Sequence, residues 1–192
     1  ASFGTALAIS GTRLCVGAPA DDPYGNTDAG SVLVYDVSQP VQLPVTLAAA
    51  LGSPPNGRLG TSVAMSGNRV MAGAPQSSSG GSAPGSALLF DLSGPAPPGL
   101  MPRTPVATFP NPAPIGGGIT QFGRAVAISA AQVAVGAPQD STGAPQAGSV
   151  FAWQLPGIPT ALTATLSGLS SPAPGDLFGS AVAVSGTRAV VG

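Results

Sequence analysis

The residues that could carry out chemistry are few, and the charged ones are of only two kinds. Among the 192 residues, all six basic side chains are arginine, all seven acidic ones are aspartate, and histidine, lysine and glutamate do not occur. Without histidine the chain cannot form a Ser-His-Asp or Cys-His pair, and without lysine it has no Schiff-base amine. Only paired aspartates or a bound metal could then move protons. The composition predicts that the protein is not an enzyme.

One acidic loop could offer oxygen ligands to a cation. Its candidate ligands are Asp21, Asp22, Asn26 and Asp28. The alternative is a turn-rich loop whose aspartates accept hydrogen bonds from nearby backbone amides, as Asp and Asn often do. We favour this self-bonded loop, because the corresponding stretches later in the chain hold a single acidic residue, Asp140. The sequence therefore predicts no cofactor, although it leaves a cation at this loop as the alternative.

Two aromatic residues, Tyr24 and Trp153, are candidate contacts for a ligand or partner. A lectin-like role would use Trp153 for stacking on a sugar, together with the acidic loop. We favour a packing role for Trp153 between structural units, because an aromatic residue recurs at the same repeat position as Tyr35 and Phe90. A carbohydrate ligand is therefore the alternative rather than the main hypothesis.

An internal repeat organises the chain and predicts its fold. Four similar blocks begin at residues 3, 59, 122 and 178 and read FGTALAISGTRLCVGAP, LGTSVAMSGNRVMAGAP, FGRAVAISAAQVAVGAP and FGSAVAVSGTRAVVG. A second block (GSVLVYD, GSALLFD, GSVFAWQ) and a weaker third apolar run follow in the first three repeats. Runs this short, bounded by Gly, Pro and Ser, predict four strands per repeat rather than helices.

Four strands per repeat is the blade pattern of a β-propeller. We therefore expect an all-β fold with about three and a third blades of four-stranded antiparallel sheet. All of residues 1–192 would belong to one propeller domain, with repeats at 3–58, 59–121 and 122–177 and a partial repeat at 178–192. A ring needs typically four to eight blades, so we expect this chain to be a segment of a longer propeller, or one whose missing blades come from another chain.

The turn between the first two strands differs in one repeat. Gly11, Gly67 and Gly186 supply the positive backbone angle that a tight hairpin usually needs, but repeat three has Ala130 and Ala131 there. We expect another turn type in repeat three, and the loosest hairpin. The Pro-rich stretch 93–120 predicts an extended surface excursion, with a docking strand as the alternative.

Cys15 and the arginines beside these turns have structural interpretations as well. Cys15 has no partner for an intrachain disulfide, and it occupies a strand position where an apolar residue is expected. An arginine recurs next to these turns, at positions 13, 69 and 188. We favour a hydrogen bond from its side chain to the turn backbone over binding of an anionic ligand.

The repeated motifs resemble the FG-GAP repeats of integrin-α-like propellers. Phe-Gly opens a strand, Gly-Ala-Pro closes the next, and Gly-Ser-Val begins a third. The resemblance implies a ring of about seven blades, often in secreted or cell-surface proteins, that serves as an adhesion or docking platform. The motif positions are Phe3, Gly4, Gly17, Ala18, Pro19, Leu59, Gly60, Gly73, Ala74, Pro75, Phe122, Gly123, Gly136, Ala137, Pro138, Phe178, Gly179 and Gly192.

Calcium is implied by the family but not by these residues. Integrin-like repeats hold calcium in a carboxylate-rich loop between the first and second strands. The corresponding turns here read SGTR, SGNR, SAAQ and SGTR, without a carboxylate. The chain therefore resembles a short-turn variety of the repeat that lacks the calcium loop.

The expected function is that of a noncatalytic structural or protein–protein interaction module in an extracellular or cell-surface assembly. Its expected partners are other protein chains or the rest of the same polypeptide, with glycans also possible. A net charge of -1 argues against nucleic acid as a partner, and no apolar stretch is long enough to span a membrane. Charged residues make up only 7% of the chain, which suggests that partners or sugars cover part of the surface.

Overall fold

Strands are the main regular secondary structure of the protein. The structure, a computed structural model, describes residues 2–39, 41–50, 55–76, 84–95, 101–112, 119–155, 162–168 and 171–192. Within these residues, three sheets have four strands each and a fourth sheet has two. The one helical element in the described part of the chain is a 3-10 turn, η1, at Pro23–Gly25. The predicted all-β fold with four-stranded blades is confirmed.

Each sheet corresponds to one repeat, and we call the sheets blades 1 to 4. Neighbouring strands pair antiparallel in chain order within every blade. Blade 1 contains β1 (Leu7–Ser10), β2 (Arg13–Ala18), β3 (Ser31–Asp36) and β4 (Val45–Ala48). Blade 2 contains β5 (Ser62–Ser66), β6 (Arg69–Ala74), β7 (Ser86–Asp91) and β8 (Ala107–Pro110). Blade 3 contains β9 (Ala125–Ile128), β10 (Gln132–Ala137), β11 (Ser149–Gln154) and β12 (Ala164–Ser167). Blade 4 contains β13 (Val182–Ser185) and β14 (Arg188–Val191).

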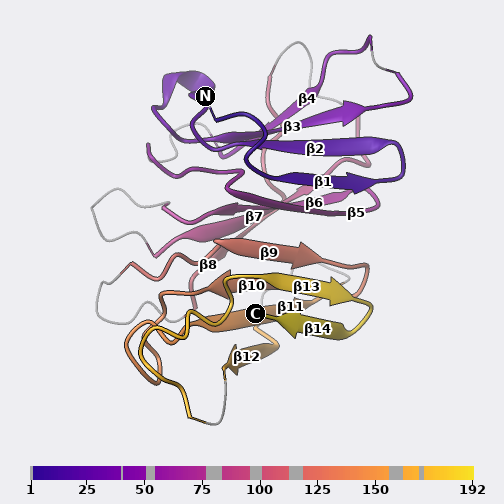
Figure 1. The fold of residues 1–192 in the computed structure, drawn as a ribbon. Coiled ribbons are helices and arrows are strands. Elements are labelled where there is room, and N and C mark those ends of the chain that lie inside the picture. Colours follow the sequence, from indigo (N-terminus) through magenta and orange to yellow (C-terminus); the bar gives the residue numbers. More distant parts are fainter. Residues whose placement is uncertain are drawn as a thin grey trace.

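Successive blades stack face to face through their first strands. β1 contacts β5, β5 contacts β9, and β9 contacts β13. Figure 1 shows this stack, from the indigo strands of blade 1 to the yellow strands of blade 4. The sheets pack on one another as propeller blades do, because each sheet must bury an apolar face against a neighbour.

The hydrophobic core lies between blades rather than inside any one of them. Between blades 1 and 2, Cys15 packs in a buried cluster with Val70 and Phe90. Between blades 2 and 3, Phe122 packs in a second cluster with Trp153. Full burial of a Phe side chain contributes on the order of 2 kcal/mol. The stability of each blade therefore depends on the neighbour that covers it.

Glycines of the repeat motif make the closest contacts between blades. The glycine of Gly-Ala-Pro lies directly against the glycine of Phe-Gly in the next repeat, backbone to backbone. A Cβ atom at the first glycine would sit too close to the carbonyl oxygen of the second, so no other residue fits without a shift. The distances from such a Cβ to that oxygen are 2.0 Å for Gly17 and Gly60, 1.9 Å for Gly73 and Gly123, and 2.0 Å for Gly136 and Gly179.

The hairpin turn of repeat three is of another type, as expected. The turn was expected to be loose, but side-chain hydrogen bonds close it. Neither Ala130 nor Ala131 has a positive φ. The Ser129 hydroxyl instead accepts hydrogen bonds from the backbone N–H groups of Ala131 (3.2 Å) and Gln132 (3.1 Å). The serine side chain closes this turn, so glycine is not required there.

Part of the Pro-rich stretch crosses from blade 2 to the outer edge of blade 1. We call residues 101–106 the strap. Its Arg103 N–H donates to the Thr46 carbonyl (2.8 Å), and the Ala48 N–H donates to the Arg103 carbonyl (3.1 Å). This part of the stretch pairs with β4 of the same chain. Residues 96–100 and 113–118 of the stretch lie outside the described residues.

Candidate interaction surface

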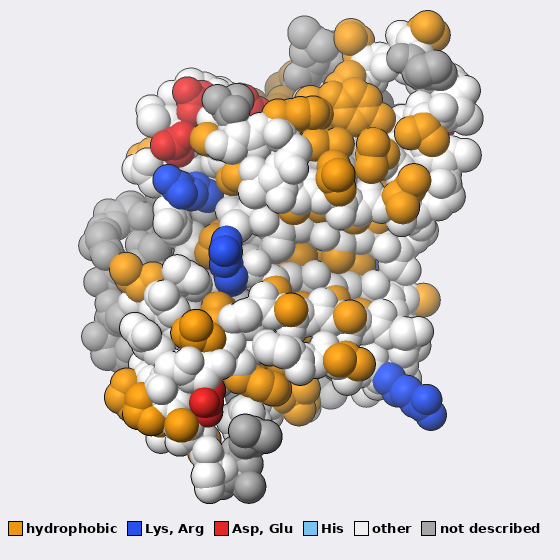
Figure 2. Space-filling model, viewed as in Figure 1, with side chains coloured by type: hydrophobic (Ala, Val, Ile, Leu, Met, Phe, Trp, Pro, Cys, Tyr) orange, Lys and Arg blue, Asp and Glu red, His pale blue; other side chains and the backbone are white. Residues whose placement is uncertain are grey.

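The outward face of blade 1 exposes apolar side chains whose counterparts are partly buried in blade 2 and fully buried in blade 3. Leu7 is 63% exposed, whereas Val126 at the same repeat position in blade 3 is 7% exposed. Ile9 is 65% exposed, whereas its counterpart Ile128 is 7% exposed. In Figure 2, orange side chains gather over the part of the molecule where Figure 1 draws blade 1. The same sequence pattern therefore makes core in one blade and open apolar surface in another.

An aromatic pair extends this open face. The Phe3 ring lies against the Tyr35 ring, with centroids 6.5 Å apart and nearly perpendicular planes. Phe3 is 57% exposed, whereas the equivalent Leu59 and Phe122 are buried. We call Phe3, Leu7, Ile9 and Tyr35 the open face of blade 1.

Trp153 lies in the core between blades 2 and 3. Its ring meets Phe109 and Phe122 at nearly perpendicular or steeply tilted angles, with centroid distances of 4.9 and 6.2 Å. It is 5% exposed. A sugar could stack on this indole only if the side chain left the core. Tyr24, the other aromatic candidate, lies on η1 and is partly exposed.

The acidic loop of blade 1 uses its carboxylates internally. Asp21 Oδ2 accepts a hydrogen bond from the Ser31 hydroxyl (2.5 Å), and Asp22 Oδ1 accepts one from the Asp28 N–H (2.7 Å). Asn26 closes η1 through its backbone N–H, which donates to the Pro23 carbonyl. Among the described residues, no group of three or more His, Cys, Asp or Glu side chains is placed to hold a metal. The geometry is that of a self-bonded loop.

A matching loop in blade 3 repeats the backbone part of this arrangement but not its side-chain hydrogen bond. Asp140 occupies the place of Asp21, and Ser149 the place of Ser31, at the start of the third strand. The backbone bonds are the same, since the Gly30 and Gly148 N–H groups each donate to the carbonyl of that aspartate (2.9 Å). In blade 3, Asp140 Oδ1 instead accepts a hydrogen bond from the Thr142 hydroxyl (2.8 Å), while Asp140 Oδ2 and Ser149 Oγ are buried without a hydrogen-bond partner. The spacing Asp-x(8–9)-Ser in the sequence could have indicated the shared backbone arrangement.

Of the arginines beside the hairpin turns, Arg13 bonds to a side chain of the next blade. Arg13 donates through Nη1 to Asn68 Oδ1 in the next blade's turn. Arg13 also faces Asp36 across the strand pair, as Arg69 faces Asp91. Hydrogen bonds from Ser38 lower the pKa of Asp36, and those from Ser93 lower the pKa of Asp91. Both carboxylates are therefore ionised at neutral pH and offset part of the arginine charge at this rim.

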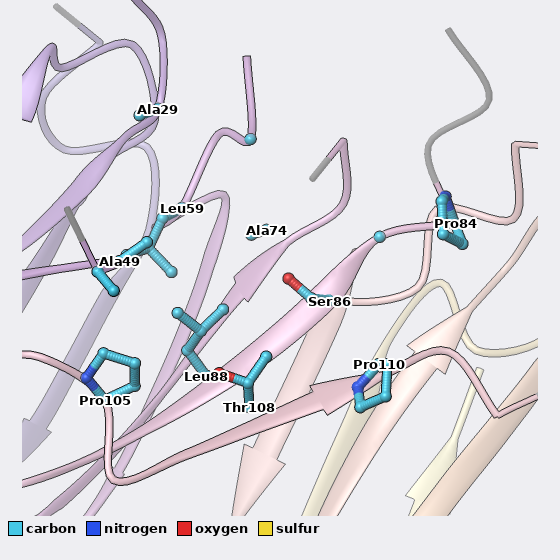
Figure 3. Close-up of a pocket in the computed structure, with 13 residues that line it drawn as sticks. Ala29, Ala49, Leu59, Ala74, Pro84, Ser86, Leu88, Pro105, Thr108 and Pro110 are labelled. Atoms are coloured by element: carbon cyan, nitrogen blue, oxygen red, sulfur yellow. The ribbon is translucent and has the colours of Figure 1, made fainter. Parts of the chain in front are cut away.

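An apolar pocket of about 350 Å³ lies between the outer parts of blades 1 and 2. Figure 3 shows Leu59, Leu88 and Pro105 on its walls, with the hydroxyl side chains Ser86 and Thr108 among them. The described residues that line it include no charged or aromatic side chain. Its chemistry suits an aliphatic group and does not suit a sugar, which needs hydrogen-bonding partners and a flat ring to stack on.

Comparisons with known proteins identify the repeat and the fold. The FG-GAP repeat family matches residues 1–35 and 116–153. No curated protein matches the chain. Among solved structures, the chain is similar to the WD40 domain of Neurospora crassa Pan2, with a TM-score of 0.51 and 12% identity over 97% of this chain and 45% of that one. The chain thus spans less than half the length of that structure, and the likeness shows a propeller fold. Within the described residues, no helix has the length and apolarity that a membrane crossing requires.

Proposed function

This chain carries FG-GAP repeats folded as blades of a β-propeller, and from that premise we propose that it is a noncatalytic protein–protein interaction module. The open face of blade 1 is the observation that carries the proposal. Scattered apolar residues on a surface need no explanation, but a contiguous apolar face on a regular sheet is typical of an interaction site. FG-GAP repeats and β-propeller scaffolds are generally noncatalytic interaction modules, which supports the noncatalytic part of the proposal.

The surface that best fits this face is another blade of the same kind. In blade 2, Met65 occupies the repeat position of Ile9, and its sulfur contacts the sulfur of Cys15 on the preceding blade at 3.6 Å. By the same geometry, the open face would receive the apolar second strand of a further blade. That blade could belong to the same polypeptide or to a separate chain.

Association in solution tests this proposal. We expect the purified chain to associate in a concentration-dependent way in sedimentation velocity, and the double variant Leu7→Ser, Ile9→Ser to remain monomeric with an unchanged melting temperature. The matched control replaces Val41, which is 95% exposed and outside the open face, with Ser. A monomeric parent chain, or equal association of parent and double variant, would contradict the assignment of this face.

We further propose that the assembly is extracellular or at a cell surface. FG-GAP repeats are typical of extracellular proteins, and the near absence of charge suits a surface that partners cover. Labelling of intact, non-permeabilised cells with an antibody against this chain tests the location. Staining that appears only after permeabilisation would contradict it.

A carbohydrate-binding role has less support in the geometry. Trp153 is buried, the apolar pocket lacks an aromatic wall, and Tyr24 is the exposed ring of the two aromatic candidates. We therefore keep protein as the proposed partner.

A further inference from the structure

A second cavity, of about 230 Å³, lies where the strap crosses blade 1. Arg13 comes from the start of β2, Asp36 from the end of β3, and Arg103 from the strap. Val45 and Leu92 add apolar surface, and Gln42 adds an amide. The fold thus brings together two guanidinium groups that are ninety positions apart in the sequence.

The strap holds Arg103 in place beside the cavity. Its backbone is paired with β4, and its side chain donates through Nη1 to the Asp91 carbonyl (3.2 Å) and through Nη2 to the Gly94 carbonyl (2.5 Å). Hydrogen bonds from Ser93 lower the pKa of Asp91, and the charge of Arg103 lowers it further, so one carboxylate lies near this guanidinium group. The Nε atom of Arg103 is buried and has no acceptor. The two carbonyl contacts preorganise the guanidinium group at the wall of the cavity.

The lining of the cavity is positive overall. Arg13 and Arg103 are its two cations, and Asp36 is the one acidic residue that lines it among the described residues. Asp36 already accepts hydrogen bonds from the Ser38 N–H (3.0 Å) and hydroxyl (2.6 Å). Planar guanidinium groups recognise carboxylates through paired hydrogen bonds.

We propose that this cavity binds the carboxylate of an acidic side chain on a partner protein, with Arg13 and Arg103 as its donors. The apolar surface of Val45 and Leu92 suits the methylene groups of a glutamate, and the exposed Leu43 at the rim would lie against the partner's chain. The inference rests on the proposed interaction function and names a chemical feature of the partner. The cavity shares Tyr35 with the open face of blade 1, but Phe3, Leu7 and Ile9 do not line it.

Arg103 is what distinguishes this site from the equivalent places in blades 2 and 3. Blade 2 pairs Arg69 with Asp91 as blade 1 pairs Arg13 with Asp36, and neither Arg69 nor Asp91 lines this cavity. Blade 3 has Gln132 and Gln154 at these positions. Arg103 lies in the stretch that makes repeat two seven residues longer than repeat one.

Titration of the full chain followed by NMR of the arginine side-chain N–H signals tests the site. The probe is N-acetyl-glutamate α-amide, its neutral counterpart is N-acetyl-glutamine α-amide, and free glutarate reports whether a small dicarboxylate binds equally well. We expect saturable shifts with the glutamate probe, none with the glutamine probe, and weaker binding at high salt. Equal shifts with both amides would overturn the proposal, and tighter binding of glutarate than of the glutamate probe would overturn its assignment to a protein side chain.

Variants at the two arginines decide which groups bind. Arg13→Gln and Arg103→Gln should each weaken binding of the glutamate probe by about tenfold or more, because each removes a charge-assisted pair. Arg188→Gln is the matched control, since Arg188 holds the repeat position of Arg13 in blade 4 and does not line the cavity. Should Arg103→Gln unfold the strap, Arg13→Gln still tests the site. Binding that survives Arg13→Gln would overturn the proposal.

Failure here can be told apart from failure of the interaction function. If the glutamate probe does not bind while the parent chain still associates through the open face, only the carboxylate site is wrong. If the probe binds while association is absent, the open face is wrong.

Discussion

Cys15 shows how the contact between blades sets the chemistry of a single residue. Its thiol is fully buried against Met65 of the next blade. Burial raises the pKa of Cys15 to about 12, and the charge of Arg13 lowers it by a smaller amount. Because thiolates rather than thiols react, this cysteine has a structural role.

We predict that Cys15 is protected from thiol reagents in the folded protein. At pH 8, Ellman's reagent should react with Cys15 at least about tenfold more slowly in the native protein than in denaturant, because burial and the raised pKa keep the thiol protonated. Since the folded pKa is raised, the contribution of the neutral thiol to stability is fully present below the unfolded pKa of 9.0 and is lost as the pH rises toward 12. Rapid labelling of the native protein at pH 8 would contradict the placement of Cys15 between blades.

At the scale of the strand, close glycine contacts join neighbouring blades in addition to the side-chain packing between them. Gly17, Gly73 and Gly136 each face the backbone of the next blade, and Gly30, Gly85 and Gly148 form bridges to the residue that opens the next repeat. A joint of this kind lets sheets approach closely, because no Cβ separates their backbones. The glycines of the repeat motif therefore mark the contacts between neighbouring blades.

We predict that Gly73→Ala destabilises the protein by about 2 kcal/mol or more, because the new Cβ would lie 1.9 Å from the Gly123 carbonyl oxygen. Gly94→Ala is the control, since the nearest atom to its new Cβ is Arg103 Nη1 at 3.9 Å. Urea unfolding measures both variants. Equal free energies of unfolding for the two variants would contradict the close contact between Gly73 and the next blade.

We also predict that folding does not depend on calcium. The turns between first and second strands carry no carboxylate, and Asp21 and Asp22 are bonded within their own loop. The melting temperature should be the same with excess EDTA and with excess calcium, as circular dichroism can measure. A clear rise in melting temperature on adding calcium would show a site that the repeat turns do not explain.

At the scale of the whole molecule, the stack of blades is covered unequally. Interior blades are packed on both faces, whereas blade 1 keeps one apolar face open. Stability in such stacked repeats is approximately a sum over units and their interfaces. The same residue type should therefore contribute differently according to its blade.

We predict opposite outcomes for two equivalent isoleucines. Ile128→Ala should cost about 2 kcal/mol or more, because it empties part of the contact with blade 2, while Ile9→Ala should change stability by less than about 0.5 kcal/mol. Thermal or urea unfolding of the two variants at a concentration where the chain is monomeric provides the comparison. A similar loss in both would mean that the face of blade 1 is covered within the chain itself.

The sequence by itself determined the repeat, the four strands of each blade and the propeller class, because these depend on short-range patterns of apolar residues, glycine and proline. It also predicted the turn change at Ala130 and Ala131, but not the Ser129 hydrogen bonds that close that turn. Side-chain bonding of this kind depends on local angles that residue types do not specify.

Only the tertiary structure decided which apolar residues are covered and which charges meet. Leu7 and Val126 have the same place in the repeat, and only the presence of a neighbouring blade separates an exposed side chain from a buried one. Arg13 and Arg103 share a cavity because the strap crosses to β4, a long-range pairing that no periodicity predicts. Local pattern specifies the blade, whereas the contacts between blades, which join residues far apart in the chain, specify the surfaces that act.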